Sequence, residues 1–120
     1  MRSARGKLAF EAGKAAEGCV EQLYLRQGFQ IVARRWRGVA GEIDLVARDG
    51  AEMIFIEVKK SDTHAHAAEH LGPRQIARLC AAASEFVAGE PMGQLTPMRF
   101  EVALVDAVGQ IEIVKNAFAA

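Results

Sequence analysis

Two largely apolar segments of the chain, residues 42–48 and 52–59, flank the dipeptide Asp49-Gly50. Asp-Gly between two such runs is typical of a tight β-hairpin turn, so the sequence predicts two adjacent antiparallel strands. Both runs also contain charged residues, among them Glu42, Asp44, Glu57 and Lys59. Burying charges in an apolar sheet costs free energy unless an opposite charge, a proton or a metal ion compensates them. These four residues therefore constrain the fold most, and they are the first candidates for a function.

A two-residue loop at Asp49-Gly50 predicts a register in which Glu42 lies opposite Glu57. Asp44 is then diagonal to Glu57, roughly 7–8 Å away by backbone position. Because alternate residues of a strand share a face, all four charged side chains are expected on one side of the hairpin. The other side is expected to carry the core residues Ile43, Leu45, Ile54, Ile56 and Val58.

Like charges directly opposite each other destabilise a sheet, so these acids need a compensating cation. Lys59 is one candidate. Mg²⁺ is the other, since it takes oxygen ligands, usually one or two carboxylates together with water and phosphate oxygens. Glu17, at the edge of an apolar helical face, would reach the same site from above the sheet. The alternative is an exposed sheet end with solvated acids, where Glu17 is an ordinary boundary glutamate.

The remaining pattern predicts one domain of 120 residues. Helices are expected at Lys7–Gln27 and from Pro73 onward, further strands at Phe29–Trp36, Phe100–Leu104 and Ile111–Ile113, and a loop at Lys60–Gly72. The first helix is expected to bury Leu8, Ala12, Ala15, Cys19 and Leu23. The order αβββαββ indicates an α/β fold with a mixed central sheet of about five strands, flanked by helices.

The amino-acid composition excludes few classes of function. Fifteen basic and fifteen acidic residues give no net charge, whereas nucleic-acid-binding domains are usually basic. No apolar run approaches the ~20 residues of a membrane span, so no membrane association is expected. Neither Cys19 nor Cys80 has a CxxC partner. We expect both to be reduced core residues in a cytoplasmic protein.

One pattern in the chain resembles the PD-(D/E)XK nuclease superfamily. It consists of a helix with Glu17, then Asp44, twelve intervening residues and Glu57-Val58-Lys59. A closer resemblance is to the YraN family, small bacterial proteins grouped with archaeal Holliday-junction resolvases. The segments that carry it are Gly13–Glu17, Ala33–Arg37, Gly41–Leu45 and Phe55–Lys59. The resemblance implies a restriction-endonuclease-like core and metal-dependent hydrolysis of phosphodiester bonds in DNA, with branched or structured DNA as a candidate substrate. The alternative is a non-catalytic nucleic-acid-binding or protein-interaction module on the same fold.

The resemblance also implies roles for single residues. Asp44 and Glu57 would bind Mg²⁺ or Mn²⁺ together with the carbonyl oxygen of Val58. Lys59 would position the attacking water or stabilise charge on the phosphate. The helix acid of the resolvase-like branch would be Glu17, the polar residue of the second helix would be Gln75, and Glu42 would be a supporting acid. The chain departs from the family pattern at Arg35, where Asn is common, and at Ser61, where Arg is frequent.

Basic residues around Trp36 suggest where nucleic acid would bind. Arg34, Arg35 and Arg37 could contact phosphates in a bidentate manner, and Trp36 could stack on a base. The alternative is a solvated strand end with the tryptophan in the core. Arg74, Arg78 and Gln75 could extend the track along the second helix, where a solvated face is an equal alternative. A homodimer is expected only by analogy with resolvases.

Three histidines, His64, His66 and His70, lie within the expected loop. A zinc site there would lack both cysteine ligands and an ordered scaffold, so we interpret the segment as a flexible, solvated loop.

Overall fold

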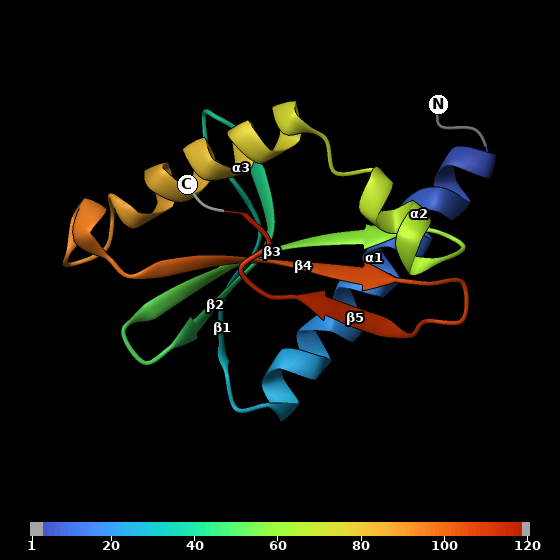
Figure 1. The fold of residues 1–120 in the computed structure, drawn as a ribbon, viewed down its shortest axis with the longest axis horizontal. Coiled ribbons are helices and arrows are strands. Elements are labelled where there is room, and N and C mark those ends of the chain that lie inside the picture. Colours follow the sequence, from blue (N-terminus) through green and yellow to red (C-terminus); the bar gives the residue numbers. More distant parts are fainter. Residues whose placement is uncertain (1–3, 119–120) are drawn as a thin grey trace.

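The computed structural model describes the backbone of residues 4–118 and the side chains of residues 13–118. Its elements, shown in Figure 1, are α1 (Ala4–Arg26), β1 (Gln30–Arg37), β2 (Glu42–Asp49), β3 (Glu52–Lys60), α2 (His64–Glu69), α3 (Pro73–Val87), a 3₁₀ turn (Gly93–Leu95), β4 (Met98–Val105) and β5 (Ile111–Val114).

The strands form one five-stranded sheet in the order β1-β2-β3-β4-β5. Neighbouring strands are antiparallel except β3 and β4, which are parallel and are connected through α2 and α3. The predicted mixed sheet of five strands flanked by helices is therefore confirmed.

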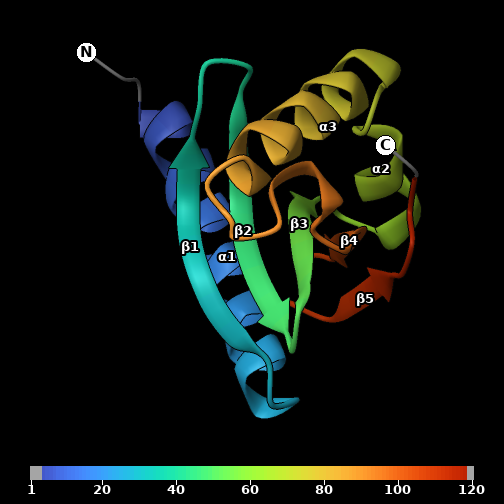
Figure 2. The same ribbon diagram turned by 90° about the vertical axis from the view of Figure 1, so that its left-hand side faces the viewer.

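Helices cover both faces of this sheet. Figures 1 and 2 show α1 on one face and α3 on the other. The core under α1 includes Val20, Leu45 and Ile56, and the core under α3 includes Leu79, Phe55 and Phe100. The sheet is thus buried on both sides, which leaves charged groups few solvated positions along its central strands.

The predicted buried face of α1 was wrong. Ala16, Val20 and Tyr24 point into the core, while Ala15 and Cys19 are exposed. Cys19 is therefore not a core cysteine, and Cys80 on α3 is only partly buried. The predicted positions Leu8 and Ala12 lie outside the residues whose side chains are described. Alanines occur on several sides of this helix, so its spacing does not single out one apolar face.

The loop predicted at Lys60–Gly72 was also wrong in part, because it contains the short helix α2. Thr63 caps this helix: its side-chain oxygen accepts a hydrogen bond from the His66 backbone N–H at 3.1 Å. Ala67 is fully buried and packs with Val102 and Leu104 of β4. A helix of six residues is too short to show a full apolar period, so the sequence pattern does not reveal it.

The register of the hairpin differs from the predicted one by two residues. Asp49 pairs with Glu52 and Leu45 with Ile56, so the turn residues are Gly50 and Ala51. Gly50 has φ +61°, a left-handed conformation that glycine adopts without steric cost. Asp44, instead of Glu42, is consequently level with Glu57.

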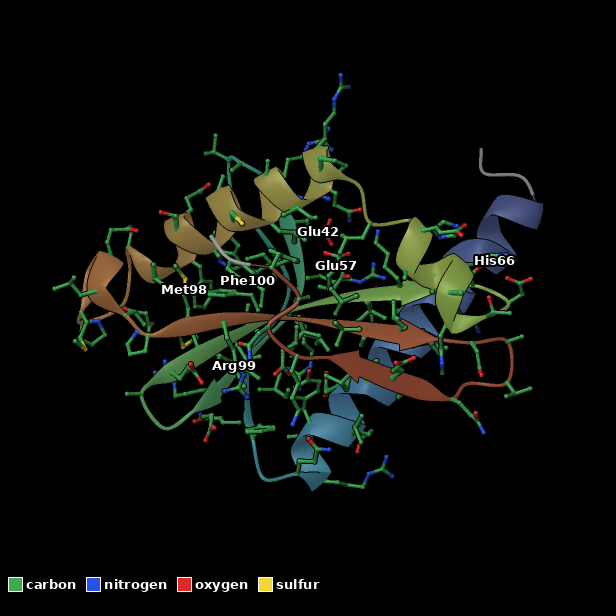
Figure 3. All side chains as sticks on the ribbon, viewed as in Figure 1. Glu42, Glu57, His66, Met98, Arg99 and Phe100 are labelled. Atoms are coloured by element: carbon green, nitrogen blue, oxygen red, sulfur yellow. The ribbon has the colours of Figure 1, made fainter. Side chains whose placement is uncertain are left out.

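A buried polar contact joins α1 to β4 on the side of the sheet away from α3. The Tyr24 hydroxyl donates a hydrogen bond to Glu101 Oε1 at 2.5 Å, and Arg99 Nε donates to Glu101 Oε2 at 2.9 Å. Tyr24 and Glu101 are 1% and 2% exposed. In Figure 3, Arg99 points away from its neighbours Met98 and Phe100, as alternation along a strand requires.

Replacing Tyr24 with phenylalanine tests this contact. The variant should unfold at lower urea concentration, with a loss of about 1–3 kcal/mol, because the buried Glu101 carboxyl group loses a hydrogen-bond donor. The ring contact of Tyr24 with Phe29, at 5.7 Å between centroids, is retained by phenylalanine, so packing changes little. An unchanged urea midpoint would show that the hydroxyl adds no stability.

Candidate active site

The two central carboxylates lie side by side on adjacent strands. The backbone pairing of β2 with β3 ends at Leu45 and Ile56, and Asp44 and Glu57 are the next residues on each strand. The backbone N–H of Val58 donates a hydrogen bond to Asp44 Oδ2 at 2.8 Å. This bond holds the Asp44 side chain against the backbone of β3, next to Glu57.

Burial and negative charge act together on Glu57, which is only 7% exposed. They raise the pKa of its carboxyl to about 9: burial contributes most, followed by the hydrogen bond and the negative charge of Asp44. The positive charge of Lys59 acts in the opposite direction, but its Nζ is 3.8 Å from Glu57 Oε1. Without a further cation, Glu57 therefore holds a proton at neutral pH.

Glu17 of α1 belongs to the same group of acids. Its side chain is 17% exposed, and Arg35 of β1 binds it through two hydrogen bonds of 3.0 and 3.2 Å. Burial and the charge of Asp44 raise the pKa of Glu17, although the Arg35 hydrogen bond lowers it. The structure thus brings Glu17 close enough to Asp44 and Glu57 for their charges to interact.

The basic residues around Trp36 are engaged within the protein. Arg34 binds Glu21 of α1 through two hydrogen bonds of 2.5 and 2.8 Å, and the Arg37 guanidinium lies 3.2 Å from Glu42. Trp36 is half-buried and meets the edge of Phe86 on α3 at 5.3 Å between ring centroids. Arg34 and Trp36 therefore tie β1 to the helices on either face of the sheet.

A pocket of about 410 Å³ lies between the first half of α3 and the start of β2. It is lined by Gly41, Glu42, Gln75, Arg78 and Leu79. Figure 3 shows Glu42 and Glu57 near each other, below the first turn of α3. The structure thus places Gln75 on the same pocket as Glu42, which lies two residues before Asp44 on β2, and Arg74 is exposed one residue before Gln75.

Glu85 of α3 is a residue near the site that the sequence did not single out. Its carboxylate accepts hydrogen bonds from the backbone N–H groups of Val39 and Ala40, at 2.9 and 3.0 Å, and these bonds lower its pKa. A Cβ on Gly38 would lie only 2.5 Å from Glu85 Oε2, so any larger residue there would displace the Glu85 side chain. Gly38 was the available signal, but the sequence could not show which acid it approaches.

The three histidines do not converge. His64 contacts the Gln110 carbonyl oxygen at 2.9 Å and Glu112 at 3.2 Å, whereas His66 binds Asp62 at 2.6 Å. That bond raises the pKa of His66. Across the residues with described side chains, no three His, Cys, Asp or Glu residues form a group that could hold a metal ion. Asp44 and Glu57 would therefore share an ion with water and substrate oxygens.

The raised pKa of Glu57 predicts a pH-dependent stability. Glu57 loses its proton near pH 4.5 when unfolded and near pH 9 when folded, so the folded state binds more protons between these values. The free energy of unfolding should then fall as pH rises, by up to about 1.4 kcal/mol per pH unit. Thermal melts in EDTA from pH 5 to pH 8 should show this fall, and Glu57→Gln should reduce it. Equal slopes in the two proteins would contradict the assignment.

Sequence comparisons place the chain in a bacterial family. The model of the family described as "Uncharacterised protein family UPF0102" matches residues 16–105. A UPF0102 protein of Cereibacter sphaeroides is 62% identical over 96% of this chain and 98% of its own length. One from Ruegeria pomeroyi is 60% identical over 97% and 94%, and one from Dinoroseobacter shibae is 39% identical over 96% and 86%.

Within the described residues, no helix is long and apolar enough to cross a membrane.

The family match spans α1 from Ala16 through β4, and therefore includes every element that contributes to the carboxylate group. It also confirms the resemblance to the YraN family, which carries the designation UPF0102. The chain is thus a member of the UPF0102 family.

Proposed function

We propose that the protein is a metal-dependent nuclease that hydrolyses phosphodiester bonds in DNA, with Asp44 and Glu57 as the metal ligands. The observation that supports this proposal is the contact of these two carboxylates, one of them buried, at the end of the β2–β3 pairing. Two acids held together in this way need a proton or a cation. A divalent ion would replace the proton of Glu57 and compensate both charges.

The donor set fits Mg²⁺ or Mn²⁺. Both ions accept carboxylate oxygens, and Mg²⁺ commonly uses only one or two carboxylates, with water and phosphate oxygens completing its coordination. When bound, the ion would polarise the phosphate and lower the pKa of a coordinated water. The Val58 N–H already orients Asp44 for this role. The carbonyl oxygen of Val58 is the third ligand that we propose.

Lys59 is the group that we propose acts on the nucleophile. Its side chain is only 18% exposed and its Nζ lies on the same side as the Glu57 carboxylate. From there it would hold the attacking water in line with the phosphorus and offset the charge that develops on the phosphoryl oxygens. Glu17, held in place by Arg35, would provide a further oxygen acceptor for water at the site.

The surface around the pocket suits a DNA backbone. Arg74 and Arg78 are exposed on α3, and neither has an ion pair among the described residues. Arg37 is 79% exposed in its side chain on the other side of Glu42. These arginines would contact phosphates of a strand that passes the carboxylate pair. Arg34, Arg35 and Trp36 would contribute only by leaving their present partners.

Metal titration together with cleavage tests the proposal. Calorimetry should detect binding of Mg²⁺ and Mn²⁺ to the wild type, strengthened by branched DNA, and loss of this binding in Asp44→Asn and Glu57→Gln. Cleavage of linear, branched or single-stranded DNA should disappear with it and should cease in EDTA. Glu112→Gln, on the distant edge strand β5, removes an equivalent charge and should leave both properties unchanged.

Two outcomes would count against a nuclease. Absence of metal binding in the wild type would remove its basis. Salt-dependent DNA binding that persists in Asp44→Asn and Glu57→Gln, without cleavage of any substrate, would instead indicate the non-catalytic binding module.

Adjacent lysines provide a second test. Lys59→Met should reduce cleavage by about 10²–10³-fold, as loss of one charge-stabilising group does in other enzymes, while metal binding persists. Lys60→Met is the matched control, because Lys60 is exposed and alternation directs it to the other face of β3. Equal cleavage by the two variants would exclude the proposed role of Lys59.

A further inference from the structure

Arg35 lies in the same row of the sheet as the carboxylate pair. The pairs Arg34–Leu45 and Trp36–Ile43 bracket Arg35 and Asp44, so these two residues are level on neighbouring strands. Asp44 is in turn level with Glu57 on the next strand. With neighbouring strands about 5 Å apart, one row across three strands holds a cation and two acids.

The backbone of Arg35 is unusual. Its φ is +47°, in the left-handed region that residues with a Cβ rarely adopt. As a consequence, Arg34 and Arg35 both reach acids of α1, although successive residues of a strand normally face opposite sides. Such backbone conformations persist only where surrounding contacts stabilise them. The two-point hydrogen bond of Arg35 with Glu17 is one such contact.

The neighbouring residue shows what distinguishes Arg35. Arg34 makes the same two-point contact with Glu21, four residues along α1 from Glu17. Burial and the charge of Asp44 raise the pKa of Glu17, whereas the pKa of Glu21 is lowered, first by its bond with Arg34. Glu17 and, to a smaller extent, Glu42 and Asp44 raise the pKa of Arg35, whereas Glu21 raises the pKa of Arg34.

We propose that Arg35 is a positioning residue that holds Glu17 beside the carboxylate pair. Its guanidinium is also a positive charge that compensates these acids and repels a divalent metal ion bound between them. This inference rests on the proposed function. It assigns to Arg35 two effects of opposite sign. Its charge weakens metal binding, and its hold on Glu17 supports turnover.

Arg35→Asn separates the two effects, because asparagine tolerates a left-handed backbone and removes the charge. Calorimetry at low salt should show a Mg²⁺ dissociation constant about threefold to fivefold lower than in the wild type. This is the size that Coulomb's law gives in water for a divalent and a monovalent cation about 10 Å apart. The gain should shrink at 0.5 M salt, where screening is strong. The turnover rate with saturating metal should nevertheless fall.

Arg34→Asn is the matched control: it removes the same charge and the same kind of ion pair from the next residue, and it should leave turnover unchanged and raise Mg²⁺ affinity less than Arg35→Asn does. Arg35→Lys, which keeps the charge but not the two-point contact, should restore wild-type metal affinity without restoring turnover. Thermal melts in EDTA establish that each variant is folded.

The outcomes separate this inference from the function on which it rests. If the wild type binds no Mg²⁺, the proposed function fails and the role of Arg35 fails with it. If the wild type binds Mg²⁺ but Arg35→Asn matches Arg34→Asn in affinity and turnover, only the role of Arg35 is overturned. Weaker metal binding in Arg35→Asn would also overturn it, because a structural residue would produce that sign.

Discussion

The pairing register of β2 against β3 is the constraint on which both the core and the site depend. It directs Leu45 and Ile56 toward α1, and Val46 and Phe55 toward α3. A slip by one residue would turn each of these side chains to the wrong face. The strands therefore cannot slide to separate Asp44 from Glu57, so the repulsion between the two acids must be met by protons or cations.

The pairing register of β2 and β3 is the part of the site that could not be predicted from the sequence. The predicted and observed pairings differ by two residues, and a shift of two keeps side chains on the same face of a regular strand because its period is two. Ile43 departs from the predicted core face, since it packs under α3 whereas Leu45 and Ile56 pack under α1. Apolar alternation consequently predicts the hairpin and the shared face of the acids but not which acid meets Glu57. The choice depends on whether the turn uses Asp49-Gly50 or Gly50-Ala51, a local backbone preference.

The remaining differences arise from contacts between distant segments. Tyr24 and Glu101 are 77 residues apart in the sequence and meet in the core, and no local sequence pattern predicts this contact. Arg35 illustrates the same limit, since its charge suggested a phosphate contact, whereas the structure shows it bound to Glu17. By contrast, the succession of the five strands along the chain, the mixed sheet and the two long helices followed from local signals such as Pro73 and Gly28, because those signals act within a few residues.

Lys59 compensates the negative charge of Glu57 only weakly. Charge-assisted hydrogen bonds between ammonium and carboxylate groups are typically ~2.7–2.9 Å long, yet Lys59 Nζ remains 3.8 Å from Glu57 Oε1. The pKa of Glu57 stays far above its ordinary value despite this cation. Arg35, the other nearby positive charge, is bound to Glu17. Within the described residues, the Asp44–Glu57 contact is therefore compensated chiefly by the proton that Glu57 retains, and the divalent ion of the proposed function would take the place of that proton.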